Sequence, residues 1–146
     1  MYQVKVKYDK MQDNGCVKPV TDTYIVDALS FTEAEARTVE YVQPYISGEF
    51  TVTDIKRVKI AELWEAPAGG DYWFEAQLEY ITTDEKTASE KRTKNRVLVQ
   101  ADNLQQAMQA VADNMKDSMA DYEAASLKKT PIVEYIKITP KDNEND

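Results

Sequence analysis

The chain has 146 residues, 42% of them hydrophobic and 30% charged, which is typical of a globular protein and excludes general disorder. Its 18 basic and 26 acidic residues give a net charge of −8, which disfavours binding to nucleic-acid phosphates. Because it has no histidine, the chain lacks the commonest general base and the commonest metal ligand.

The first half of the chain predicts three strands. Residues 2–8 alternate apolar and polar side chains, the pattern of a strand with one buried face. A polar loop with Asn14 and Gly15 precedes residues 23–29, whose β-branched side chains predict the second strand of a hairpin. Residues 49–64 then interleave apolar and charged side chains, and we expect them to form the third strand.

A helix is predicted between the second and third strands. Ser30 and Glu33 have the spacing of a capping box, in which each side chain accepts a hydrogen bond from the other residue's backbone N–H. The helix is therefore expected over residues 31–46, ending before Gly48. Pro44 lies in its last turn and predicts an early or kinked end, because proline has no backbone N–H.

The second half repeats this order after a linker at residues 66–71. Its predicted elements are strands over residues 73–81, 96–101 and 131–136, and a helix that begins after residue 103. Asn103 and Gln106 occupy the capping positions that Ser30 and Glu33 occupy in the first half. Residues 141–146 are expected to form a mobile acidic tail.

The two halves match when the sequence is shifted along itself by 72 or 73 positions. The apolar residues of the first strand, Tyr2, Val4, Val6 and Tyr8, correspond to Phe74, Ala76, Leu78 and Tyr80. We therefore predict an α+β fold made by tandem duplication of a β-β-α-β unit, with six mainly antiparallel strands, two helices on the sheet and a pseudo-twofold axis. Because each repeat alone would bury little, repeats 1–66 and 72–137 are expected to form one domain over residues 1–140.

Residues that correspond between the repeats are the best candidates for a binding site, because a twofold module can build a site from equivalent positions. Glu62 matches Glu134 within apolar segments, and two tyrosines match on the first strands. Tryptophans beside the linker could stack on a planar ligand or fill the junction of the repeats, and the glutamates could simply face solvent. The candidate ligand-binding residues are Tyr8, Tyr80, Glu62, Glu134, Lys5, Lys7, Trp64 and Trp73.

The first strands of the two repeats also suggest how the repeats could pair. Lys7 corresponds to Glu79, so a pseudo-twofold arrangement could place these strands side by side with opposite charges facing. Independent solvated charges are the alternative.

Motifs for catalysis or cofactor binding are missing from the sequence. Cys16 has no histidine to activate it, the four glycines form no phosphate-binding loop, and there is no Cys/His cluster for zinc. We therefore predict no enzyme activity, no cofactor and no metal. Because the N-terminal residues do not resemble a signal peptide and no apolar run approaches ~20 residues, we expect a cytoplasmic protein away from the membrane.

Residues 26–56, VDALSFTEAEARTVEYVQPYISGEFTVTDIK, closely resemble the signature of an uncharacterised family of small proteins from anaerobic gut bacteria and their phages. The segments DYWFEAQLEY and MADYEAASLKKTPIVEY extend the resemblance over residues 2–134. The family resembled is a domain of unknown function, so the resemblance implies no catalytic residues. Its phage association implies a role in replication, regulation or counter-defence.

Three functional hypotheses follow. The first is a non-enzymatic binding or regulatory protein that holds a partner protein or a small-molecule ligand at the junction of the repeats or on the open sheet face; the partner could also be a second copy, giving a homodimer. The second is a single-stranded nucleic-acid-binding protein, in which Lys5 and Lys7 alternate with Tyr2 and Tyr8, although the net charge disfavours it. The third is a carboxylate-based enzyme.

Overall fold

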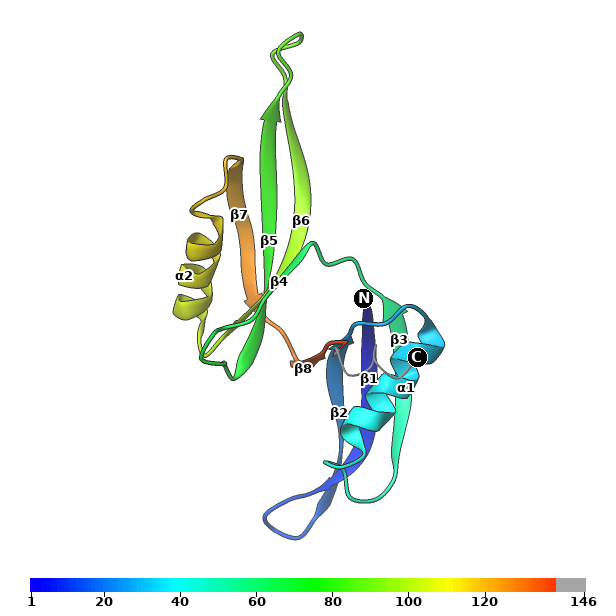
Figure 1. The fold of residues 1–146 in the computed structure, drawn as a ribbon. Helices are drawn as coiled ribbons and strands as arrows, with labels where there is room; N and C mark the ends of the chain where they lie inside the picture. Colours follow the sequence, from blue (N-terminus) through cyan, green and yellow to red (C-terminus); the bar gives the residue numbers. More distant parts are fainter. Residues whose placement is uncertain (139–146) are drawn as a thin grey trace. The chain divides into compact units, whose positions relative to one another are not determined.

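The computed structural model describes residues 1–138, which form two compact units (Figure 1). Unit 1 comprises residues 1–58 and the described residues from Ile132 onward, and unit 2 comprises residues 59–131. Each unit contains one four-stranded sheet and one helix, so the fold is α+β. The prediction of six strands is wrong, since the described residues form eight strands in two sheets.

Unit 1 places its helix on a sheet whose strand order is β3-β1-β2-β8. Its elements are β1 (Tyr2–Met11), β2 (Val17–Val26), α1 (Phe31–Val42), β3 (Phe50–Arg57) and β8 (Ile132–Ile136). The pairs β1–β2 and β1–β3 are antiparallel, whereas β8 runs parallel to β2.

Unit 2 has the corresponding strand order β7-β5-β6-β4. Its elements are β4 (Glu62–Trp64), β5 (Tyr72–Thr83), β6 (Glu90–Ala101), α2 (Leu104–Met115) and β7 (Asp121–Lys129). Here β5 pairs antiparallel with β6 and β7, and β4 runs parallel to β6.

The short last strand of each sequence half lies in the sheet of the other unit. β4 follows β3 along the chain but pairs with β6, and β8 follows β7 but pairs with β2. The expected linker at residues 66–71 is therefore a connection inside unit 2, and the units are bounded by Val58 and Pro131 instead. That linker is anchored to the end of β6, where the side chain of Gln100 accepts from the N–H of Ala66 at 3.1 Å.

The predicted helix starts are confirmed, with the same difference in both caps. Ser30 Oγ accepts from the N–H of Glu33 at 3.1 Å, but Glu33 Oε2 accepts from Leu29, the residue before the cap, and not from Ser30. In α2, Asn103 Oδ1 accepts from the N–H of Gln106 at 2.8 Å, but Gln106 Oε1 likewise accepts from the residue before the cap, Asp102. α1 ends at Val42, two residues before Pro44 and earlier than the predicted residue 46.

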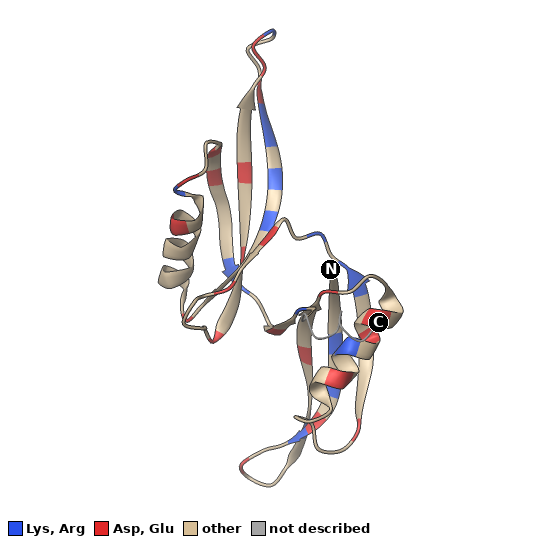
Figure 2. Cartoon of the chain, viewed as in Figure 1, with Lys and Arg blue, Asp and Glu red and all other residues tan. Residues whose placement is uncertain are grey.

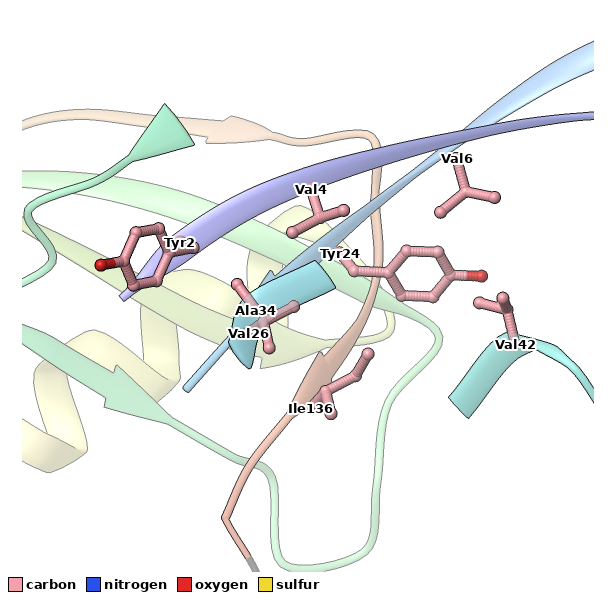
Figure 3. Close-up of a cluster of buried hydrophobic side chains, with 8 residues drawn as sticks. All are labelled: Tyr2, Val4, Val6, Tyr24, Val26, Ala34, Val42 and Ile136. Atoms are coloured by element: carbon pink, nitrogen blue, oxygen red, sulfur yellow. The ribbon is translucent and has the colours of Figure 1, made fainter. Parts of the chain in front are cut away.

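Each helix buries one narrow stripe against its sheet. The buried residues are Ala34, Thr38 and Val42 in α1, and Ala107, Val111 and Met115 in α2. Figure 3 shows the core of unit 1, which consists of Tyr2, Val4, Val6, Tyr24, Val26, Ala34, Val42 and Ile136. A core cluster of unit 2 consists of Ala76, Leu78, Val97, Val99, Val111 and Met115. β8 thus contributes directly to the core of unit 1.

The two sheets share a bulge at the same position. The β1–β3 register shifts between Lys5 and Val6, so that no residue of β1 lies directly opposite Thr53. The β5–β7 register shifts between Gln77 and Leu78, 72 residues later, so that no residue of β5 lies directly opposite Ala125.

The predicted pairing of Lys7 with Glu79 is wrong. β1 is flanked on both edges by β2 and β3, and β5 by β6 and β7, so neither strand has an edge available for the other. Glu79 accepts instead from Arg92 of the neighbouring strand, at 3.0 Å. The prediction of a single domain stays a prediction, and the tail predicted at residues 141–146 lies outside the described residues.

Candidate functional site

An open groove of about 460 Å³ lies between α1 and β8 in unit 1. Its lining residues are Arg37, Glu40, Tyr41, Pro44, Tyr45, Tyr135, Ile136 and Lys137. Residues three and four apart lie on the same side of a helix, so Arg37, Glu40 and Tyr41 project together from α1. β8 pairs with β2 and supplies Tyr135 and Ile136 to the lining of the groove.

Tyrosine rings dominate this groove. The rings of Tyr41 and Tyr45 lie 5.5 Å apart with an angle of 41° between their planes. Tyr41 also packs edge-on against Tyr24, at 5.9 Å. The hydroxyl of Tyr135 donates to Asp27 Oδ2 at 3.1 Å, which fixes that ring. Tyr45 is 76% exposed, so it contributes little to the core of unit 1.

A second layer of polar groups lies beside the groove, on the helix-covered face of the sheet. The hydroxyl of Tyr8 donates to Asp22 Oδ2 at 3.0 Å, and burial together with Asp22 raises the pKa of Tyr8. Burial, followed by the charge of Asp22, also raises the pKa of Tyr24. Glu134 pairs with Tyr24 in the register of β8 and β2. Its carboxylate, after burial, contributes to a raised pKa of Tyr41.

We expect Tyr8, Tyr24 and Tyr41 to ionise above the ordinary tyrosine pKa of 10.0 in the folded protein. The raised pKa favours the neutral phenol in the folded state. The resulting stability is fully present below pH 10 and is lost as the pH rises through the folded-state pKa values. A phenolate absorbance titration should therefore show late-titrating tyrosines when folded but not in urea. Asp22→Asn should shift two of these transitions to lower pH; one common transition near pH 10 in the folded protein would contradict the assignment.

Unit 2 contains a corresponding groove of about 350 Å³ between α2 and β4. Its lining includes Ala110, Asp113 and Asn114 of α2, Trp64 at the end of β4, and Glu65 directly after β4. In the repeat alignment, Arg37, Tyr41 and Lys137 of unit 1 correspond to Ala110, Asn114 and Glu65. The two grooves therefore occupy equivalent places but differ in chemistry: only the unit 1 groove combines a tyrosine pair with basic side chains among its lining residues.

The structure distributes the predicted aromatic residues between different environments. Tyr8 lies beside Asp22, as described above, whereas the hydroxyl of Tyr80 contacts Met115 Sδ at 3.8 Å in unit 2. Trp64 is half-buried and lines the unit 2 groove. Trp73 is only 3% exposed, so its ring is not available for stacking on a ligand.

The predicted charged residues do not form one cluster within either unit. Lys5 and Lys7 lie on the face of β1 opposite Tyr8. Glu62 is exposed on β4 in unit 2, and Glu134 is half-buried on β8 in unit 1.

The groove tyrosines were missed because the search was restricted to residues that match between the repeats. A signal was present at Tyr45, which follows the last helical residue Val42 and is exposed. Tyr41 lies beside the core stripe, seven residues after Ala34, and packs partly against the core of unit 1.

Within the described residues, no group of three or more cysteine, aspartate or glutamate side chains is arranged to hold a metal ion. Cys16 is exposed. Among the same residues, no helix has the length and apolar character that crossing a bilayer requires.

The chain is thus a two-unit α+β protein in which each unit has an open groove between its helix and a short strand. A family model described as a domain of unknown function, DUF4494, matches residues 1–138, and the chain belongs to this family. The resemblance to an uncharacterised family is thereby confirmed. No curated protein and no solved structure shows a significant match to the chain.

Proposed function

We propose that the protein is a non-enzymatic binding protein that holds a partner protein in the groove between α1 and β8. The observation that carries this proposal is the tyrosine pair in an open groove, in which Tyr45 is exposed and Tyr41 is half-buried. Tyrosine is enriched in protein interfaces because its rigid ring supplies apolar contact area and its hydroxyl can form a hydrogen bond. The side chains around the pair carry both signs of charge, as in the polar rim of an interface.

The charges of the groove favour a protein over a small anionic ligand. A nucleotide-like ligand would need basic side chains to meet its phosphates. Arg37 is already paired with Glu33, with 2.9 Å between Nη2 and Oε1, and Glu40 adds a negative charge to the groove. An anion would therefore meet a partly neutralised site, whereas a protein segment with mixed charges would not be repelled.

The proposed binding is tested by comparing equivalent substitutions in the two units. Tyr41→Ala combined with Tyr45→Ala removes the ring pair, and Asn114→Ala combined with Ser118→Ala changes the corresponding positions of unit 2. After incubation in host lysate, native mass spectrometry should show a large added mass on the wild type and on the unit 2 variant. The bound fraction of the tyrosine variant should be at least tenfold lower, because aromatic anchors often contribute about 2 kcal/mol to binding. Equal binding by all three chains would reject the groove, and a small added mass would favour a ligand-binding function instead.

The nucleic-acid alternative receives less support. Its stacking component would require Tyr2, but that ring is 2% exposed and packs edge-on against Phe31 at 4.9 Å. Retention of single-stranded DNA or RNA on a filter at low salt would restore this alternative. A carboxylate-based enzyme remains the third proposal. Its candidate carboxylates, Glu62 and Glu134, belong to different units.

We also propose that the chain arose by tandem duplication. The supporting features recur at a spacing of 72 or 73 residues: the strand order, the capped helix start, the buried helix stripe and the bulge at Thr53 and Ala125. Under this proposal, the tyrosine groove is a specialisation of one of two equivalent sites.

A further inference from the structure

β7 forms one edge of the sheet in unit 2. It pairs with β5 along one side, and within the described residues no other strand pairs with it. Natural proteins usually protect such edges with charge, proline or an irregularity, because unpaired backbone groups can pair with another strand. The centre of β7 carries only the small, exposed residues Ala124, Ala125 and Ser126. The bulge at Ala125 is the one irregularity along this edge of the described chain, and the middle of the strand carries no charge and no proline.

The charges of β7 are separated along its length. Asp121 and Glu123 lie in its first half, and Lys128 and Lys129 end it; Figure 2 shows this as red at one end of the strand and blue at the other. Two antiparallel copies of such a strand place the acidic half of each against the basic half of the other. Cross-strand pairs of opposite charge stabilise a sheet, so the edge is complementary to itself.

The bulge sets the register in which this pairing works. It reverses the alternation of side chains after Ala125, so Tyr122 and Leu127 both face the helix side of the sheet, while Asp121 and Lys128 both face the other side. With a twofold axis between Ala124 and Ala125, Asp121 lies opposite Lys128, and Tyr122 lies opposite Leu127. Like faces therefore meet like faces, and the pair of Asp121 with Lys128 forms twice, whereas Glu123 lies opposite Ser126 and Lys129 has no acidic residue opposite it.

An apolar groove beside β7 provides room for the second copy. It has a volume of about 240 Å³ and lies between α2 and β7, lined by Ala76, Met108, Val111, Ala112, Tyr122, Ala124, Ser126 and Leu127. Three of its alanines, Ala76, Ala112 and Ala124, replace the valines Val4, Val39 and Val52 at the corresponding positions of unit 1. Met108 is 60% exposed at this groove. The smaller side chains leave space that apolar side chains from the helix side of a paired β7 would fill.

The corresponding edge strand of unit 1 differs in what lies beside it. Glu49 and Lys56 occupy the positions equivalent to Asp121 and Lys128, so the charge pattern recurs there, although Glu49 lies just before β3. At the positions where the groove beside β7 has Ala76, Ala112 and Ala124, unit 1 has valines. The apolar groove therefore distinguishes the edge of unit 2 from that of unit 1.

We propose that two copies of the chain associate through antiparallel pairing of their β7 strands, which joins the two unit 2 sheets into one continuous sheet. The self-complementary charges, the uncharged centre and the adjacent apolar groove all select a second copy as the occupant of this edge. This association is separate from the partner proposed for the groove of unit 1 and does not depend on it.

Sedimentation velocity over a hundredfold range of protein concentration tests the proposal. We expect the wild type to form a dimer that weakens as salt is raised, because the cross-strand pairs are solvent-exposed. Ala125→Lys places two lysines next to the twofold axis and should raise the dissociation constant roughly tenfold or more. Thr53→Lys, at the corresponding bulge position of β3, is the matched control and should leave the dimer unchanged.

A charge exchange separates pairing from damage to the fold. Asp121→Lys should weaken the dimer about fivefold, because each copy then faces Lys128 of the other with a like charge. Adding Lys128→Asp to the same chain should restore the dimer, because the pairs between copies are again opposite in sign, although it removes the ion pair between Lys128 and Glu75 within the sheet. A wild type that stays monomeric throughout, a dimer that survives Ala125→Lys, or a dimer lost equally in Thr53→Lys would overturn the proposal.

Discussion

Ending the chain after Pro131 is expected to unfold unit 1 and to leave unit 2 folded. The truncation removes β8, whose Ile132 and Ile136 are 6% and 9% exposed, and uncovers the edge of β2. Burial of two isoleucines contributes about 1.5–3 kcal/mol each. A unit of this size is marginally stable, so the loss would remove most of its free energy of unfolding. Every strand of unit 2 lies between residues 59 and 131 and is retained.

Hydrogen exchange measured by mass spectrometry can follow both units in this experiment. Amides of β1, β2 and β3 should lose protection in the truncated chain, whereas those of β5, β6 and β7 should keep it. A chain ended after residue 138 keeps β8 and is the control. Unchanged protection of β1 after truncation at Pro131 would show that β8 is not needed for unit 1.

Leu78→Ala is expected to have the largest effect of any single substitution in unit 2. Leu78 is fully buried in the core cluster between the sheet and α2. Replacing a buried leucine by alanine removes its transfer free energy and leaves a cavity, which together cost about 2–5 kcal/mol. Urea denaturation should detect this loss as a lower midpoint for the transition of unit 2.

Two other substitutions serve as controls for Leu78→Ala. Val6→Ala changes the corresponding position of unit 1 and removes fewer buried atoms, so its effect should be smaller and confined to unit 1. Met108→Ala shortens an exposed side chain and should change the free energy of unfolding by about 0.5 kcal/mol or less. If Leu78→Ala and Met108→Ala had equal effects, the assigned core of unit 2 would be wrong.

Local features of the fold were predictable because they depend on neighbouring residues. The capping residues Ser30 and Asn103 marked both helix starts, and the alternation over residues 2–8 marked the first strand. Pro44 indicated the early end of α1, where the structure places the last helical residue at Val42. These signals act over three or four residues and do not require knowledge of the rest of the fold.

The exchange of short strands was not predictable in this way. Residues 49–64 were expected to form one strand, but the chain leaves the sheet of unit 1 after Arg57 and enters unit 2 at Glu62. The partner of a strand depends on contacts between distant residues, and periodicity does not reveal them. β7 was missed for another reason, because its DYEAASLKK sequence has little apolar alternation at an edge exposed to solvent.

Equivalence between the repeats indicated the strands that line the two grooves but not the tyrosines of the proposed site. Glu62 and Glu134 matched, and their strands β4 and β8 line the two equivalent grooves. The chemistry of the candidate site comes from Tyr41 and Tyr45, whose counterparts Asn114 and Ser118 are not aromatic. A comparison of repeats for differences as well as matches would have drawn attention to them.

Photo-crosslinking at Tyr45 tests the proposed binding function most directly. Replacing Tyr45 with p-benzoylphenylalanine keeps an aromatic ring in the groove, and the same replacement at Ser118 provides the control in unit 2. The proposal predicts that irradiation in host lysate joins a protein partner to the chain labelled at position 45 and not to the chain labelled at 118. Equal adducts at both positions, or none at position 45, would contradict it.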